Sequence, residues 1–113
     1  MLGLFLGIAA IIAVGVVIAH VAMLSVKYLI SKAKNMMAKK NVKKVAVMEL
    51  EKLIEECPNQ TSLAELEDEG VDAIFASVDE NGNVEDVECV SADNIDPAYQ
   101  EKLGDEGMLV ING

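Results

Sequence analysis

Residues 2–26, LGLFLGIAAIIAVGVVIAHVAMLSV, decide how this chain of 113 residues is expected to fold. Fourteen of them are Leu, Ile, Val or Phe, and His20 is the only ionisable side chain among them. At about −0.4 kcal/mol for each such residue, the stretch favours insertion into a bilayer by roughly 6 kcal/mol. As a helix it reaches about 37 Å, more than the apolar thickness of a bilayer, about 30 Å. The pattern therefore predicts one transmembrane helix over residues 1–30.

A cleaved signal peptide is the competing interpretation of the same stretch. Such a peptide has a positively charged start, an apolar run of about 7–15 residues and a cleavage site between small residues. Here no charged side chain precedes the run, and the run is about twice as long as a signal peptide requires. We therefore expect a membrane helix that is retained.

Charge is divided unevenly along the chain. Residues 1–44 carry seven lysines and no acid, whereas residues 45–113 carry two lysines and all nineteen acids. Because positive charge collects on the cytoplasmic side, this division predicts a single-pass protein of the cell membrane with its N-terminus outside and its C-terminal domain in the cytoplasm. Lysines just after the span attract membrane lipid, and the residues expected to contact lipid headgroups are Lys27, Lys32, Lys34, Lys39 and Lys40.

Small residues fall on two sides of the predicted membrane helix. The first group is Gly3, Gly7 and Ala10, and the second group is Gly15, Ala19 and Ala22. Small residues four apart let helix backbones approach closely, so we interpret both groups as helix-packing sites. His20 lies on neither side, and we expect a neutral, packed side chain there.

Residues 31–57 are predicted to form a basic neck that continues into an amphipathic helix. The segment 31–44 holds six lysines and neither Pro nor Gly, so a helix can continue through it. From residue 42 to residue 57 the apolar positions recur at steps of three and four, until Pro58 ends the pattern. Nucleic acid is not an expected partner, because arginine and interleaved aromatic residues are absent and the rest of the chain is acidic.

Residues 58–113 are predicted to form a small acidic α+β domain with a β-hairpin, short helices and a final strand. The hairpin strands 73–78 and 84–90 flank Asn81-Gly82, the pair preferred in type I′ turns. The predicted pairs are Ile74 with Cys89, Phe75 with Glu88, Ala76 with Val87, Ser77 with Asp86, and Val78 with Glu85. One face of this hairpin is apolar and the other is mainly polar, which predicts that one side is exposed. A helix begins at Asp96-Pro97 and ends at Gly104, and the last strand covers residues 108–111.

The sequence shows no arrangement of catalytic residues. Its only His lies in the predicted membrane helix, so the rest of the chain lacks a Ser/His/Asp or Cys/His set. Cys57 and Cys89 have no CxxC spacing and are expected to be buried thiols. The run Asp79-x-Asn81-x-Asn83 lacks the Gly and the Glu that a calcium loop carries at its sixth and twelfth positions. We therefore expect no enzymatic activity, no metal, no cofactor and no small-molecule substrate.

Together these features predict a non-catalytic accessory or scaffold subunit of a membrane complex. Its membrane helix would pack against other membrane subunits or against a second copy, and its acidic domain would face cytoplasmic partners. In outline, an apolar N-terminal helix followed by an amphipathic helix and a small sheet resembles the type IV pilins. This resemblance implies, as the alternative function, a structural subunit of a pilin-like filament built on the N-terminal helix.

Overall fold

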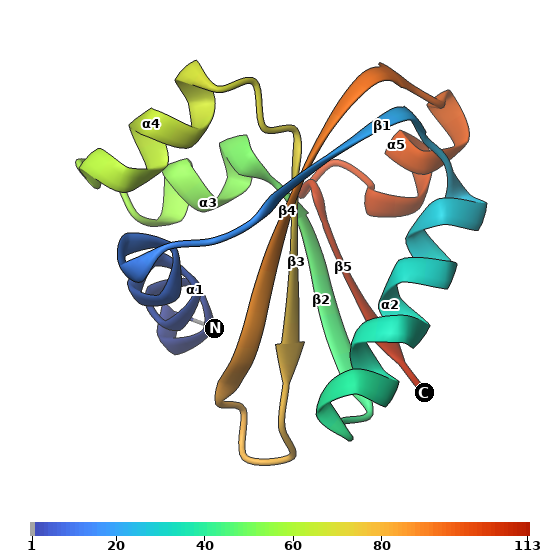
Figure 1. The fold of residues 1–113 in the computed structure, drawn as a ribbon, viewed down its shortest axis with the longest axis horizontal. Coiled ribbons are helices and arrows are strands. Elements are labelled where there is room, and N and C mark those ends of the chain that lie inside the picture. Colours follow the sequence, from blue (N-terminus) through green and yellow to red (C-terminus); the bar gives the residue numbers. More distant parts are fainter. Residues whose placement is uncertain (1) are drawn as a thin grey trace.

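A five-stranded mixed β-sheet organises the chain in the computed structural model, which describes residues 2–113 (Figure 1). Along the chain the elements are α1 (Leu2–Val14), β1 (Ile18–Leu24), α2 (Val26–Lys40), β2 (Lys44–Glu49), α3 (Leu50–Glu56), α4 (Thr61–Asp68), β3 (Ala73–Val78), β4 (Val84–Ile95), α5 (Pro97–Leu103) and β5 (Met108–Asn112). The strand order is β1-β4-β3-β2-β5. β1 is parallel to β4, and every other neighbouring pair is antiparallel.

The apolar N-terminal stretch does not form the predicted membrane helix. It divides into α1, β1 and the beginning of α2. The break follows Val14, where Gly15 adopts a φ of 141° that a residue with a side chain rarely adopts. The β-branched residues after it, Val16, Val17 and Ile18, favour extended backbone. Within residues 2–113 no helix is both long and apolar enough to cross a membrane, so the predicted fold with a transmembrane helix over residues 1–30 is wrong.

The single-pass localisation depended on that helix and is therefore not supported either. The predicted orientation is not supported for the same reason. It places the N-terminus outside and the C-terminal domain in the cytoplasm. The start of the chain packs instead into the same protein core as the rest of it. Phe5, Ile8 and Ile12 of α1 are buried against residues of the sheet and of α3 and α4.

The predicted helix over residues 42–57 is also wrong in its first half. α2 ends where Asn41 adopts the left-handed conformation at φ 54°, and the chain then enters β2. Val45, Ala46, Val47 and Met48 of this strand are all buried, because β2 lies between β3 and β5 with helices on both sides. An apolar run of this kind suits a strand buried on both faces, and periodicity alone does not separate it from a helix.

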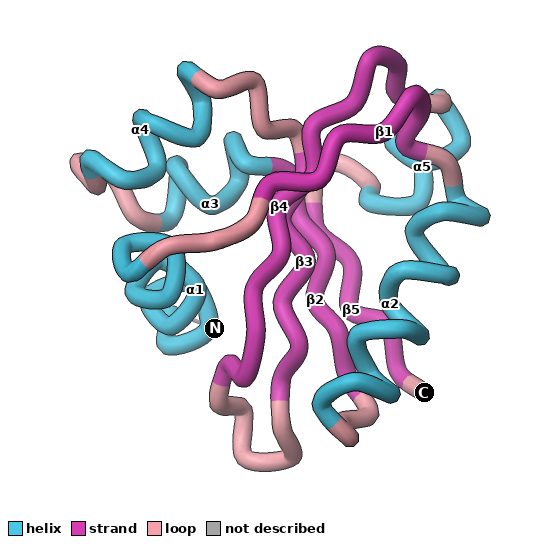
Figure 2. The backbone as a smooth tube through the Cα atoms, in the orientation of Figure 1, coloured by secondary structure: helices cyan, strands magenta, loops and turns pink. Residues whose placement is uncertain are grey.

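Helices cover both faces of the sheet (Figures 1 and 2). On one face α1, α3 and α4 enclose a core that includes Ile8, Leu53 and Ile74. On the other face α2 and α5 enclose a second core around Phe75 and Tyr99. Helices therefore cover both faces, in an arrangement of helix, sheet and helix layers.

The hairpin of β3 and β4 pairs largely as predicted. Four of the five predicted pairs are present, from Ile74 with Cys89 to Ser77 with Asp86. The fifth is wrong, because a β-bulge shifts the register and pairs Val78 with Val84. The exposed polar face is wrong too, since all six residues of β3 are buried, including Ser77.

The hairpin turn differs from the predicted type I′ turn. The N–H of Gly82 donates to the carbonyl of Asp79 at 3.0 Å, and the N–H of Asp79 donates to the carbonyl of Asn83 at 2.9 Å. Gly82 has a φ of 84°, whereas Asn81 does not have a positive φ. These bonds define a three-residue hairpin loop whose last residue, Gly82, adopts the left-handed conformation. The Asp79 carboxylate accepts the backbone N–H groups of Asn81 and Asn83, and the Asn83 bond is the main cause that holds the pKa of Asp79 below its ordinary value.

Candidate functional site

The outer edge of β1 is the most unusual surface of the molecule. β1 pairs with β4 on one side, and among the described residues it pairs with no strand on the other. The carbonyl of Val17 accepts the N–H of Cys89, so the backbone of Val17 is turned toward β4. The register of β1 on β4 omits Ala22, and the carbonyl of Leu24 accepts the N–H of Asp96, so simple alternation holds only as far as Val21. Because backbone groups alternate sides along a strand, the N–H and carbonyl groups of Ile18 and His20 are turned outward. They form a row of donors and acceptors along the edge of the sheet.

The composition of β1 does little to protect this row. Natural sheets protect their edges with lysines, prolines, bulges or very short strands. β1 is seven residues long, IAHVAML, and contains no lysine or proline. Large apolar side chains around it face solvent: Val14 is 92% exposed, Val17 is 77% exposed, and Met23 is also exposed. An apolar edge of this length is a template for pairing with another chain.

His20 lies in the middle of this edge strand. Its Nε2 is 3.0 Å from an Asp93 carboxylate oxygen on β4, and both side chains are well exposed. The His20 side chain is therefore not packed, contrary to the prediction from the sequence. An exposed pair of this kind stabilises a fold by about 0–1 kcal/mol, so it contributes little to holding β1 in place.

The six residues predicted to pack helices do not share one helix. Gly3, Gly7 and Ala10 lie on α1, Gly15 lies in the break, and Ala19 and Ala22 lie on β1. Gly7 does make a close approach, because a Cβ at this position would lie 3.1 Å from Cγ2 of Val84. Ala22 is exposed on the outer strand. Of the six, Gly7 is the one that lies close to the sheet, whereas Gly3, Ala10, Gly15 and Ala22 are exposed.

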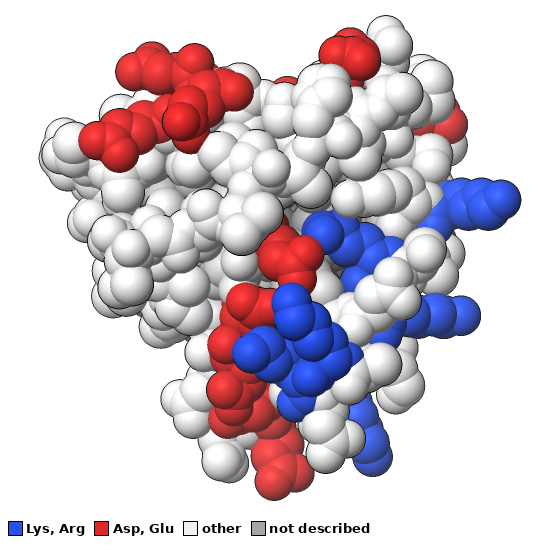
Figure 3. Space-filling view, in the orientation of Figure 1, with Lys and Arg blue, Asp and Glu red and all other residues white. Residues whose placement is uncertain are grey.

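The lysines predicted to contact lipid headgroups all lie on α2. Figure 3 shows lysine side chains gathered on the side of the molecule that carries this helix. Lys27, Lys34, Lys39 and Lys40 are exposed, whereas Lys32 is half-buried. Contact between these lysines and lipid stays a prediction.

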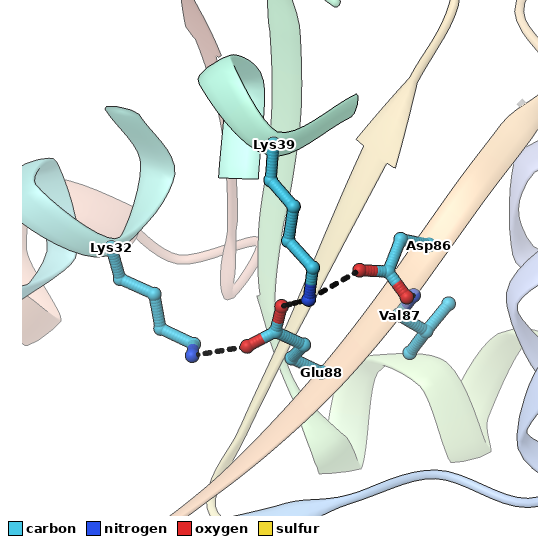
Figure 4. Close-up of polar contacts among 5 residues, drawn as sticks. All are labelled: Lys32, Lys39, Asp86, Val87 and Glu88. Atoms are coloured by element: carbon cyan, nitrogen blue, oxygen red, sulfur yellow. Dashed lines mark hydrogen bonds and ion pairs between the residues drawn. The ribbon is translucent and has the colours of Figure 1, made fainter. Parts of the chain in front are cut away.

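Lys32 and Lys39 reach across to acidic residues of β4 (Figure 4). Nζ of Lys32 donates to Oε1 of Glu88 at 2.6 Å, and Nζ of Lys39 lies 3.6 Å from Oε2 of Glu88 and 3.8 Å from Oδ2 of Asp86. Burial raises the pKa of Glu88, but the Lys32 hydrogen bond and the two ammonium charges outweigh it and leave the pKa below its ordinary value. Glu88 is therefore ionised at neutral pH.

This network has a structural explanation. It closes one side of a cleft of about 290 Å³ beside α2. Lys32, Lys39 and Glu88 line the cleft, and both ammonium groups already have carboxylate partners in Glu88 and Asp86. Removing one member would leave a partly buried charge without a partner, which is costly. Such pairs therefore favour the one packing arrangement in which every charge is paired. We interpret it as the contact that orients α2 on the sheet.

The free thiols are placed as the sequence predicts. Cys57 and Cys89 are both unbonded and buried. Burial raises the pKa of the Cys89 thiol to about 12, so it is protonated and unreactive at neutral pH. Within residues 2–113 no three His, Cys, Asp or Glu side chains are grouped in a way that could hold a metal ion.

Comparison with known proteins adds no assignment: no family model, no curated protein and no solved structure matches this chain.

Proposed function

We propose that this chain is a non-catalytic assembly subunit that associates with a second copy of itself through the outer edge of β1. The observation that carries this proposal is the unpaired apolar edge described above. Two β1 strands would run antiparallel about a two-fold axis, so that the same surface of each copy contacts the other. The two five-stranded sheets would then become one continuous sheet.

Three features support this arrangement. Backbone pairing would satisfy the outward groups of Ile18 and His20 in both copies. The exposed side chains of Val17 and Met23 would be removed from water at the same contact. Residues 2–26 contain no acid and no lysine, so the net charge of −10 is carried elsewhere and opposes the contact weakly.

The filament alternative requires a long N-terminal helix with a free apolar surface. In this fold the helix ends at Val14, and its residues Phe5, Ile8 and Ile12 are packed against the sheet. The edge strand therefore supports self-association better than α1 does.

A proline at residue 20 tests the proposal. His20→Pro removes an outward N–H from the edge, leaves the bonds from β1 to β4 in place, and otherwise loses only the exposed contact of His20 with Asp93. By symmetry the change removes two hydrogen bonds from the dimer, which is expected to weaken association at least about tenfold. Sedimentation velocity over a range of protein concentrations measures the dimer population, and circular dichroism checks that the fold is kept.

Val110→Pro is the matched control on the opposite edge of the sheet. Glu49 N–H donates to Gly107 and Gly113 N–H donates to Lys43, so alternation turns the N–H of Val110 away from β2. This variant is expected to dimerise like the parent. A parent that stays monomeric at every concentration, or equal losses in the two variants, would contradict the proposal.

A further inference from the structure

A second cleft lies at the end of the sheet where three strands finish. β1 is parallel to β4, and β2 runs in the same direction because each of β2 and β4 is antiparallel to β3. Leu24, Glu49 and Ile95 end these strands and line the cleft, whose volume is about 260 Å³. In sheets covered by helices, ligands bind in the crevice beyond the carboxyl ends of parallel strands.

The charge of this cleft is one-sided. Four carboxylates line it, and among the described lining residues there is no lysine or histidine to neutralise them: Glu49, Glu51, Glu67 and Asp72. This sets it apart from the cleft beside α2, where lysines and carboxylates face one another. A cation is therefore the favoured occupant.

Backbone contacts hold two of these carboxylates in place. Oδ2 of Asp72 accepts the N–H of Ala92 at 2.8 Å, which fixes the side chain and leaves its other oxygen without that bond. Glu49 lies against Gly107, where an added Cβ would come within 2.9 Å of Oε2. The absence of a side chain at Gly107 thus leaves room for the Glu49 carboxylate.

Tyr99 supplies an independent sign of a missing partner. It lines the cleft from α5 and is 2% exposed, yet among the described residues its hydroxyl has no hydrogen-bond partner. Burial raises the pKa of Tyr99 above its ordinary value, and the nearby charges of Glu49 and Asp72 raise it further. The hydroxyl therefore stays neutral beside two carboxylates. A buried hydroxyl without a partner is costly, and it is a common sign of an unfilled polar position.

We propose that this cleft binds a small organic cation, a primary amine on a short alkyl chain. The ammonium group would donate to Glu49 and Asp72, and the Tyr99 oxygen would accept its third proton. Leu24, Leu50 and Ile95 give the cleft an apolar wall against which methylene groups can pack. Such a wall suits an alkylammonium compound better than a hydrated metal ion. The site does not depend on the β1 edge.

Calorimetric titration with 1,4-diaminobutane tests the proposal. We expect saturable binding that weakens at least about tenfold in Glu49→Gln and in Asp72→Asn, because each variant removes a charge-assisted hydrogen bond. The matched controls are Glu65→Gln and Asp68→Asn, which make the same charge changes on the exposed side chains of α4 away from the cleft. These controls are expected to bind as the parent does, within about twofold.

Tyr99→Phe separates a binding role from a structural one. The variant keeps the buried ring and removes only the unpartnered hydroxyl, so its melting temperature should be unchanged or higher while its affinity for 1,4-diaminobutane falls. The proposal is overturned by any of three results: no saturable binding to the parent, tighter binding of Ca²⁺ than of the diamine, or equal losses in the cleft variants and the α4 controls.

Discussion

Replacing Ser77 with Asp is expected to lower the free energy of unfolding by about 3–5 kcal/mol. Ser77 is 0% exposed and its hydroxyl has no hydrogen-bond partner among the described residues. It lies directly opposite Asp86 on β4, so a second carboxylate would be buried beside a like charge. The hairpin pattern in the sequence predicts the opposite, an exposed site where this change costs almost nothing.

Two further variants define the scale of that effect. Ser77→Ala removes the unpartnered hydroxyl without adding charge, and its unfolding free energy should be equal to or above that of the parent. Ser31→Asp places the same acid on the exposed surface of α2, where a change within about 0.5 kcal/mol is expected. Urea unfolding followed by circular dichroism measures all three. If Ser77→Asp is as mild as Ser31→Asp, the second covered face of the sheet is wrong.

Ile8→Asp is expected to destabilise the protein by a similar amount, about 3–5 kcal/mol, or to release α1 from the sheet. Ile8 is 0% exposed and packs in the core formed by α1, α3, α4 and the sheet. The matched change is Leu6→Asp on the same helix, where the side chain is 50% exposed. This second variant should cost less than about 1 kcal/mol.

The two variants also separate the observed fold from a lone apolar helix. A helix surrounded by lipid would tolerate an acid equally badly at both positions, because both side chains would meet the same apolar medium. A helix packed on a sheet has an inner and an outer side. Equal losses in Ile8→Asp and Leu6→Asp, measured by urea unfolding, would therefore contradict the packing of α1.

Local signals in the sequence predict the C-terminal half of the fold well. The helix that begins after Asp96 is confirmed, with the Asp96 carboxylate accepting the N–H of Ala98 and Pro97 in the first turn. Gly104 ends that helix, and the last strand follows at residues 108–112. Hairpin pairing is predicted because turn and strands are adjacent in sequence. The turn type and the bulge are missed because they depend on the hydrogen bonds that the Asp79 carboxylate accepts from Asn81 and Asn83 and on the register shift at Val78.

The N-terminal half could not be predicted in the same way. The hydrophobicity of residues 2–26 predicts that they are buried away from water, but either a bilayer or a protein core can bury them. The contact that decides between them is non-local, since β1 pairs with β4 from Ile18 with Cys89 to Leu24 with Ile95. Gly15 and the β-branched residues after it mark the break in the sequence, but glycine and β-branched residues are also common in membrane helices.

The two clefts also differ in how much of each could be predicted from the sequence. The lysines of α2 are conspicuous in the sequence, yet their partners Asp86 and Glu88 alternate with buried residues and suggest an ordinary exposed strand face. The sequence does not predict the second cleft, which Tyr99 lines, because its residues come from separate elements. Glu49 lies at the end of β2 and Asp72 lies before β3. Separately, each acid is consistent with a solvated surface.

The central claim is that residues 18–24 form a strand beside β4 as part of one sheet. Nuclear Overhauser effects in uniformly labelled protein test it most directly. The account predicts backbone contacts between Ala19 and Val90 and between Val21 and Ala92, with slow amide exchange at residues turned toward β4. Helical contacts three and four residues apart through residues 15–24, with no contact to β4, would contradict it.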